Sequence, residues 1–200
     1  MPINTTYQSF PLPVQEILLE AEPDIDGHSD AFEACWPNMF LNCPAFGWLF
    51  WTGTHWEQKG AGGALQDAIV QMLYLRRHIA VDNDKEALLK SAKVTRSNKQ
   101  AIKEHLANRL YIGPEAFDNE PYKLNCRNGV VGLADGGLEK HYARAHRFTY
   151  CIEVDYDPTA DTSIVEKHFR EDLADPVEMV PFLKRAFGYS LTGSTREEKL

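Results

Sequence analysis

The side chains with the clearest chemistry are basic ones that gather between residues 85 and 109. Seven cations face two carboxylates there, so this segment has a net charge of +5 in a chain whose formal net charge is −8. Arg96, Lys99 and Lys103 are spaced i, i+3, i+7, which places them on one side of a helix. Such a face is either simply solvated or a surface for the phosphate backbone of a nucleic acid. The seven cations are Lys85, Lys90, Lys93, Arg96, Lys99, Lys103 and Arg109.

A smaller basic group follows between residues 141 and 147, and we interpret it in the same way. It consists of His141, Arg144, His146 and Arg147. The residues predicted to contact DNA, taken from both groups, are Lys90, Lys93, Arg96, Lys99, Lys103, Arg144 and Arg147. The acidic chain as a whole argues against a surface that attracts nucleic acid everywhere, so any such contact must be local.

Other reactive side chains give no catalytic pattern. The four cysteines form no CxxC pair, and we expect reduced thiols packed as small apolar groups; a zinc site of His141, His146 and Cys151 fits no standard spacing. Phosphate-binding loops, dinucleotide fingerprints and hydrolase motifs are absent. Acidic pairs such as Asp155 and Asp157 stand where helix caps or turns are expected. We therefore predict no catalytic residue, no metal ligand and no cofactor within this chain.

These residues must be positioned by a fold of 200 residues, enough for one domain or two small ones. No apolar run approaches the length of a membrane span and no export signal is visible, so we expect a cytoplasmic protein without a membrane partner. Aromatic residues around a turn at Gly53 predict a β-hairpin over 47–58. Residues 64–110 predict a helical block. Short helices are expected at 14–21 and 30–36, with a turn-rich segment at 24–29 between them.

The second half predicts a small antiparallel meander followed by two helices. Strands are expected at 122–126 and 130–133, joined by a tight type I′ turn at Asn128-Gly129, and again at 148–154. A helix is expected to start near residue 161. Another begins with Asp175 as N-cap and ends at Gly188, with Pro181 either kinking it or moving its start. The predicted fold class is therefore α+β, with an aromatic hairpin, a meander, a helical block and a C-terminal helical segment.

The order of these elements resembles the N-terminal domain that precedes the helicase in phage, plasmid and poxvirus primase–helicases. The resemblance covers roughly residues 28–200. It rests on the aromatic hairpin, on the run from Pro121 to Leu133 with Asn, two further residues and then Asn-Gly, and on the run from Phe182 to Ser194. The residues that carry the family pattern are Trp48, Trp51, Trp56, Asn125, Asn128 and Gly129. Two departures are Gly132, where the family usually has Asp, and Pro181, in a helix that usually lacks proline.

The resemblance implies a division into an accessory α+β domain at 1–158 and a helical, collar-like segment at 159–200. A superfamily 3 helicase motor, which uses ATP and Mg²⁺, would follow outside this chain. Expected partners are single-stranded DNA, the primase and helicase modules of the same polypeptide, and further copies in a ring. Residues expected at subunit contacts are Phe182, Lys184, Arg185 and Tyr189.

Three functions stay open at this point. The first is a non-catalytic replication domain that links primase to helicase, aids ring assembly and contacts single-stranded DNA. The second is a protein-docking module without DNA contact, using the aromatic hairpin or the 159–195 helices. The third is an unrecognised enzyme, such as a metal-dependent nuclease or a fragment of a primase, whose activity would depend on Asp155 or Asp157.

Overall fold

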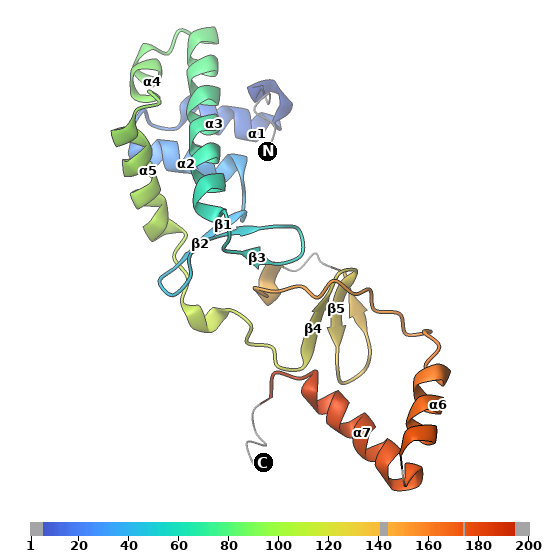
Figure 1. Ribbon diagram of the computed structural model, residues 1–200. Helices are drawn as coiled ribbons and strands as arrows, with labels where there is room; N and C mark the ends of the chain where they lie inside the picture. Colours follow the sequence, from blue (N-terminus) through green and yellow to red (C-terminus); the bar gives the residue numbers. More distant parts are fainter. Residues whose placement is uncertain (1–5, 141–143, 174, 195–200) are drawn as a thin grey trace. The chain divides into compact units, whose positions relative to one another are not determined.

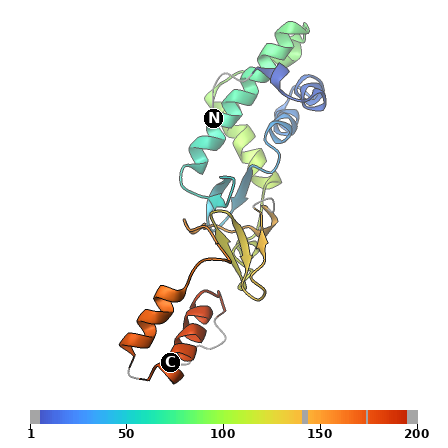
Figure 2. The same cartoon turned by 90° about the vertical axis from the view of Figure 1, so that its right-hand side faces the viewer.

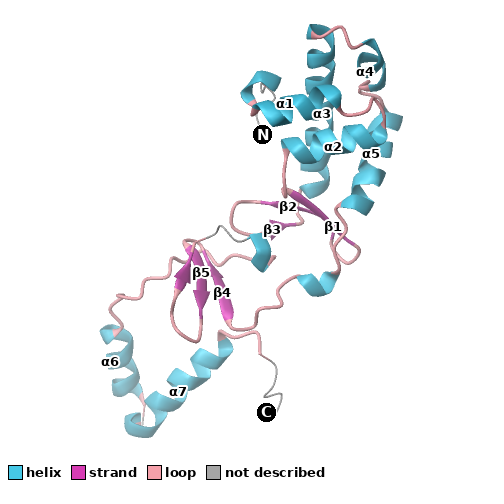
Figure 3. Cartoon of the chain, turned by 180° about the vertical axis from the view of Figure 1, so that it is seen from behind, coloured by secondary structure: helices cyan, strands magenta, loops and turns pink. Residues whose placement is uncertain are grey.

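The computed structural model describes residues 6–140, 144–173 and 175–194, and these form two compact units (Figure 1). Unit 1 comprises Met1–Thr52 and Trp56–Pro114, and unit 2 comprises Gly53–His55 and Glu115–Leu200. The expected fold class, α+β, is confirmed. Helices and two three-stranded antiparallel sheets alternate along the described residues, and Figure 3 shows the strands in magenta.

Unit 1 packs five α-helices around one apolar core and adds a small sheet. Its helices are α1 (Leu12–Glu20), α2 (Ile25–Cys35), α3 (Ala61–Asp82), α4 (Glu86–Ser91) and α5 (Arg96–Arg109), and its strands are β1 (Phe40–Cys43), β2 (Gly47–Trp51) and β3 (Trp56–Glu57). The expected helical block is confirmed as α3, α4 and α5. Fully buried core residues come from four of these helices and β1, among them Leu18, Phe32, Phe40, Met72 and Ile102.

The expected hairpin is confirmed, with one more strand than the sequence indicated. β2 pairs antiparallel with β3, and Trp51 lies opposite Trp56 across a loop that contains Gly53. The rings of Trp51 and Trp56 are 5.5 Å apart, and both side chains are buried. They therefore serve as packing residues of a hairpin. The added strand, β1, pairs with the other edge of β2.

The prediction of a turn-rich segment at 24–29 is wrong, because α2 already starts at Ile25. Asp24 is the N-cap, and its carboxylate accepts a hydrogen bond from the N–H of Gly27 at 2.9 Å. This satisfies one of the unpaired donors of the first turn. Gly27 is required because a Cβ there would lie 2.1 Å from the carbonyl oxygen of Glu22.

A buried arginine joins α1, α2 and α3. Arg76 is fully buried and donates to the carbonyls of Leu18, Ala21 and Glu22, the last carbonyls of α1 and the turn after it. It also donates to Nδ1 of His28 at 2.9 Å. Burial, followed by the Arg76 charge, lowers the pKa of His28 to about 4, and burial lowers that of Arg76 to about 10. At neutral pH the arginine is charged and the histidine is neutral.

Unit 2 contains the second sheet and a pair of helices. Its strands are β4 (Lys123–Cys126), β5 (Gly129–Gly132) and β6 (Leu138–Glu139), and its helices are α6 (Ser163–Asp172) and α7 (Pro176–Ser190). Short 3-10 turns occur in both units: one in unit 1 at Tyr7–Ser9, one where the units meet in sequence at Pro114–Ala116, and one in unit 2 at Arg144–His146. The two expected C-terminal helices are confirmed, and Figure 2 shows them side by side in orange and red.

Two details of the meander differ from the expectation. The β4–β5 turn is one residue earlier, because Cys126 pairs with Gly129 and leaves Arg127 and Asn128 at its centre. Neither has a positive φ, so this is not a type I′ turn. Residues 148–154 form no strand; they make one isolated parallel bridge, between Cys126 and Ile152. Two backbone hydrogen bonds, from Ile152 to Asn125 and from Arg127 to Val154, hold this segment together with side-chain bonds from Asn125 and Asp118.

α7 keeps its expected start but not its expected end. Asp175 caps it by accepting hydrogen bonds from the N–H groups of Val177 and Glu178. Pro181 lies inside the helix and does not move its start, since one missing N–H removes a single backbone bond. Gly188 does not end the helix, which continues to Ser190. No helix in the described residues has the length and apolar character needed to cross a membrane.

Candidate nucleic-acid interface

α5 is fixed by its apolar side. On its basic side Arg96 is exposed, and Lys99 and Lys103 are half-buried. Ile102 and Leu106 are fully buried in the unit 1 core. At its start, Thr95 accepts a hydrogen bond from the N–H of Asn98 at 3.2 Å. At its end, Asn42 of β1 donates its side-chain amide to the carbonyl of Ala107 at 3.1 Å. The helix is therefore anchored at both ends and along one face.

The structure separates the seven cations of residues 85–109 into two groups. Lys85 pairs with Glu20 at 3.1 Å, and Lys90 pairs with Glu86 at 2.5 Å. Arg109 contacts three carboxylates, as described below. In the part of the chain that the structure describes, Lys93, Arg96, Lys99 and Lys103 form no ion pair. We call these four residues the α5 basic face.

Lys93 precedes α5 in sequence but is held at its first turn. The side-chain amide of Asn98 donates to the carbonyls of Ser91 and Lys93, at 3.0 and 2.8 Å. These bonds fold the segment between α4 and α5 back onto the helix. Lys93 is therefore kept near the first turn of α5, where it adds a fourth cation to Arg96, Lys99 and Lys103. A group of four cations suits a polyanion.

Arg109 lies at the other end of α5 and does not belong to this face. Its guanidinium contacts carboxylates from α2, with nitrogen–oxygen distances of 3.1 Å to Asp26, 2.7 Å to Asp30 and 2.7 Å to Glu33. Burial alone would lower the pKa of Arg109, but the Asp30 hydrogen bond and the three negative charges outweigh it and raise the pKa. This cation is committed to holding α5 against α2.

The second basic group belongs to unit 2 and is partly neutralised. Nδ1 of His146 lies 2.8 Å from Glu120, and its Nε2 lies 3.0 Å from Glu139. Arg144 starts the 3-10 turn that contains His146, and Arg147 follows it with a φ of 50°. His141 lies outside the described residues. Arg144 and Arg147 remain candidates, and we treat them apart from the α5 basic face.

The Asn-x-x-Asn-Gly run binds the 150–156 segment to the β4–β5 hairpin. Asn125 is fully buried and donates to the carbonyls of Thr54 and Tyr150, at 3.0 and 2.6 Å. Asn128 donates to the carbonyl of Tyr156 and accepts from its N–H, both at 2.9 Å. The run is therefore a structural clamp, which the sequence alone did not reveal.

Gly129 completes this clamp by allowing close approach of β6. A Cβ on Gly129 would lie 2.3 Å from the carbonyl oxygen of Glu139. Gly132 is at the position where the family resemblance led us to expect Asp, and a Cβ there would lie 2.6 Å from the carboxylate oxygen of Asp135, a side-chain end that can move. Backbone packing thus explains glycine at the start of β5 only.

The residues expected at subunit contacts lie on α7. Phe182 is 54% exposed and Arg185 is exposed. Lys184 is engaged with Glu166 of α6 at 2.6 Å, and the Tyr189 hydroxyl donates to the carbonyl of Ser194. Phe169 of α6 stacks on Phe187 of α7 at 6.0 Å. The two helices hold each other through these contacts and still expose apolar side chains.

The acidic pairs have structural roles in the structure. Arg127 binds Asp155 through two hydrogen bonds, at 2.9 and 2.6 Å. This hydrogen bonding is the main reason why the pKa of Asp155 is lowered. Asp157 accepts from the N–H and hydroxyl of Thr159. No group of three metal-ligating side chains occurs among the described residues. Burial raises the pKa of Cys35 to about 12, as expected for a packed thiol.

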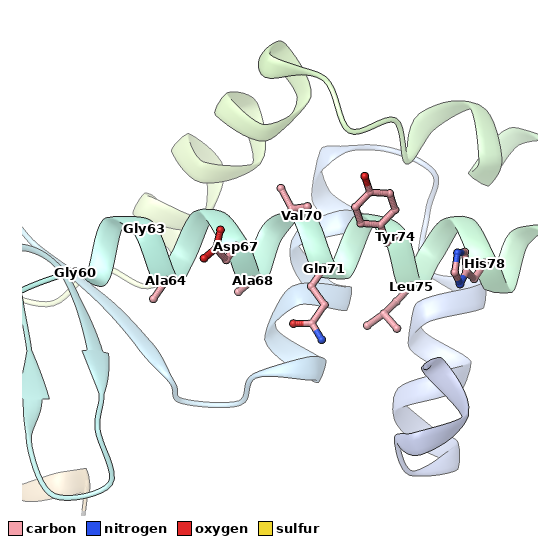
Figure 4. A pocket seen from close by; sticks show the side chains of 10 residues that line it. All are labelled: Gly60, Gly63, Ala64, Asp67, Ala68, Val70, Gln71, Tyr74, Leu75 and His78. Carbon is pink, nitrogen blue, oxygen red and sulfur yellow. The ribbon is translucent and has the colours of Figure 1, made fainter. Parts of the chain in front are cut away.

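A hollow of about 650 Å³ runs along α3, and Figure 4 shows that its lining residues all come from this helix and the Gly60 that precedes it. They recur at helical spacing, from Gly60 and Gly63 to Tyr74 and His78. The hollow brings together no catalytic set.

Comparison with known families identifies the class of protein. A family model described as D5 N terminal like matches residues 30–174, more than half of the chain. The chain belongs to this family, the N-terminal domains of D5-like primase–helicases. The resemblance stated from the sequence is thereby confirmed. A search of curated proteins gives no match.

Proposed function

We propose that this chain is a non-catalytic DNA-replication domain of a phage- or plasmid-type primase–helicase and that it contacts single-stranded DNA through the α5 basic face. Family membership supports the replication context. One observation carries the DNA contact: among the described residues, Lys93, Arg96, Lys99 and Lys103 form no ion pair, while the neighbouring cations Lys85, Lys90 and Arg109 are paired with carboxylates.

The physical argument is that a line of unpaired cations attracts a polyanion even on an acidic protein. The chain has a net charge of −8, so a phosphate backbone is repelled from most of its surface. The α5 basic face is a local exception. Ion-paired cations would contribute less, since the partner carboxylate offsets their attraction for phosphate. In this proposal the domain links primase to helicase and aids ring assembly, and ATP and Mg²⁺ act in the motor.

The experiment is charge reversal on α5. The triple variant Arg96→Glu, Lys99→Glu, Lys103→Glu is titrated into a labelled single-stranded oligonucleotide, and fluorescence anisotropy is recorded. We expect affinity to fall by more than about tenfold, because three phosphate contacts become repulsions. The matched control is Lys59→Glu, Lys140→Glu, Lys167→Glu, which changes net charge equally at other exposed lysines. Equal loss in both variants, or unchanged binding in the α5 variant, contradicts the proposal.

A second candidate function is docking of protein modules through α6 and α7. The observation that favours it is the amount of apolar surface these helices expose: Ile164, Val177 and Phe182 are 78%, 82% and 54% exposed. Large exposed apolar patches mark interaction sites. Sedimentation of the chain with and without Phe182→Asp tests it. Loss of association with the primase or helicase modules, or with further copies, supports docking, and an unchanged profile counts against it.

A further inference from the structure

An open groove of about 990 Å³ lies between α1 and α2, and Arg109 at the end of α5 also lines it. Both helices present residues to it at helical spacing. On α1 and the residue after it these are Pro13, Glu16, Ile17, Glu20 and Ala21, and on α2 they are Asp30, Glu33 and Ala34. We call this surface the α1–α2 groove.

The floor of the groove is apolar. Pro13, Ile17 and Ala21 are spaced i, i+4, i+8 along α1, and Ala34 lies across from them on α2. Ile17 is 39% exposed. Covering such side chains releases about 25 cal/mol for each Å² of apolar area removed from water. The floor therefore favours an occupant with apolar side chains of its own.

The rim of the groove is acidic. Glu16 and Glu20 line it from α1, and Asp30 and Glu33 line it from α2. Asp26 lies beside them on the same Arg109. Five carboxylates thus face two cations, Arg109 and Lys85, so the rim keeps a net negative charge. Glu16 has no ion pair in the described part of the chain. The rim repels nucleic acid and attracts cations.

We propose that the α1–α2 groove binds a basic amphipathic helix of a partner protein. A valley between two helices accepts a third helix, whose apolar side chains enter it at i, i+3, i+4 and i+7. Lys and Arg beside those anchors would meet the acidic rim on both sides. The charge of the rim selects a basic helix over an acidic one.

The chain's own basic helix does not meet this description. The apolar residues of α5, Ile102 and Leu106, are fully buried in the unit 1 core. In a second copy, α5 could therefore bring cations to the rim but no apolar side chain to the floor. The occupant must supply both, which excludes α5 and points to a helix that exposes apolar and basic side chains together.

The test uses a labelled synthetic helix built of Leu and Lys at amphipathic spacing, and the same peptide with every Lys replaced by Glu. Anisotropy should show saturable binding of the Lys peptide and none of the Glu peptide. Glu16→Lys should weaken binding roughly tenfold, because an attraction becomes a repulsion at the rim. The matched control, Asp67→Lys, makes the same charge change on the exposed side of α3 and should change affinity by less than about threefold.

A second variant separates the apolar floor from the charge of the rim. Ile17→Asp adds a negative charge, so a purely electrostatic contact would bind the Lys peptide more tightly, whereas the proposed groove binds it more weakly. Tryptophan fluorescence verifies that the variant is folded. The proposal is overturned if the Lys peptide shows no saturable binding or if both peptides bind equally. It is also overturned if Glu16→Lys and Asp67→Lys have equal effects, or if Ile17→Asp binds the Lys peptide more tightly. Self-association of the chain that Glu16→Lys abolishes would show that the occupant is a second copy instead.

Discussion

His28 makes the stability of unit 1 dependent on pH. Its folded pKa of about 4 lies below the usual value of 6.5, first because of burial and then because of Arg76. As pH falls below 6.5 the unfolded chain binds a proton that the folded chain refuses, so stability is lost on acidification. The loss grows until the pH reaches the folded pKa and amounts to about 3 kcal/mol in full.

We therefore expect urea unfolding of unit 1 to occur at lower denaturant at pH 5 than at pH 7. All four tryptophans, Trp36, Trp48, Trp51 and Trp56, belong to unit 1, so their fluorescence reports this unit alone. His28→Gln keeps an acceptor for Arg76 but does not titrate. It should be less stable at pH 7 yet lose much less stability between pH 7 and pH 5; an equal loss would show that another group is responsible.

Asn128 gives a residue-scale prediction for unit 2. Its side chain exchanges two hydrogen bonds with the backbone of Tyr156. Asn128→Ala removes both, at a cost of about 1–2 kcal/mol. Amide hydrogen exchange at Tyr156 should become faster. Asn119→Ala is the control, because the Asn119 amide donates only a longer bond of 3.5 Å to Glu115. Unchanged protection of Tyr156 in Asn128→Ala would contradict the clamp.

At the scale of elements, glycines in β5 and α7 should respond to alanine with opposite signs. Gly129→Ala places a Cβ 2.3 Å from the Glu139 carbonyl, so β6 must move away and the β5–β6 pairing is lost. Gly188→Ala meets nothing within 4 Å on a helix, and should stabilise α7 by about 1 kcal/mol. Thermal unfolding followed by circular dichroism measures both. Stabilisation by Gly129→Ala would contradict the close approach.

The elements show which parts of the fold were readable from the sequence. Periodic apolar residues predicted α3 and α5, and Gly53 between aromatic residues predicted the β2–β3 hairpin. The start of α2 was missed because Asp24 is its N-cap, and Asp is also a common residue in turns. The strand expected at 148–154 is not formed, because only Ile152 and Val154 make backbone hydrogen bonds to β4 and the turn after it. The backbone of Thr149 and Tyr150 is bound instead by the side chains of Asp118 and Asn125.

The candidate site was readable only in its local part. The spacing of Arg96, Lys99 and Lys103 placed them on one side of a helix, and α5 confirms that helix. The sequence did not show which cations form ion pairs, because the partners lie far away in the sequence. Lys85 pairs with Glu20, and Arg109 pairs with Asp26. Long-range ion pairs thus decide the size of the basic face, and the sequence gives no signal of them.

At the scale of the whole molecule, net charge and local charge make different predictions about salt. The chain is acidic overall, so any DNA binding must come from the few cations that remain unpaired. Four phosphate contacts on a single strand give a slope of about −3 in a plot of log affinity against log salt concentration. Raising salt from about 50 to 200 mM should then weaken binding roughly 50-fold.

The same plot tells whether DNA binding depends on the unpaired cations alone or on the total charge of residues 85–109. Lys99→Gln removes a member of the α5 basic face and should flatten the slope by about 0.7. Lys85→Gln removes the same charge from a residue already paired with Glu20, and should leave the slope unchanged. If both variants flatten the slope equally, the seven cations act together and the ion pairs do not restrict binding. If only Lys99→Gln does, the fold itself selects which cations meet DNA.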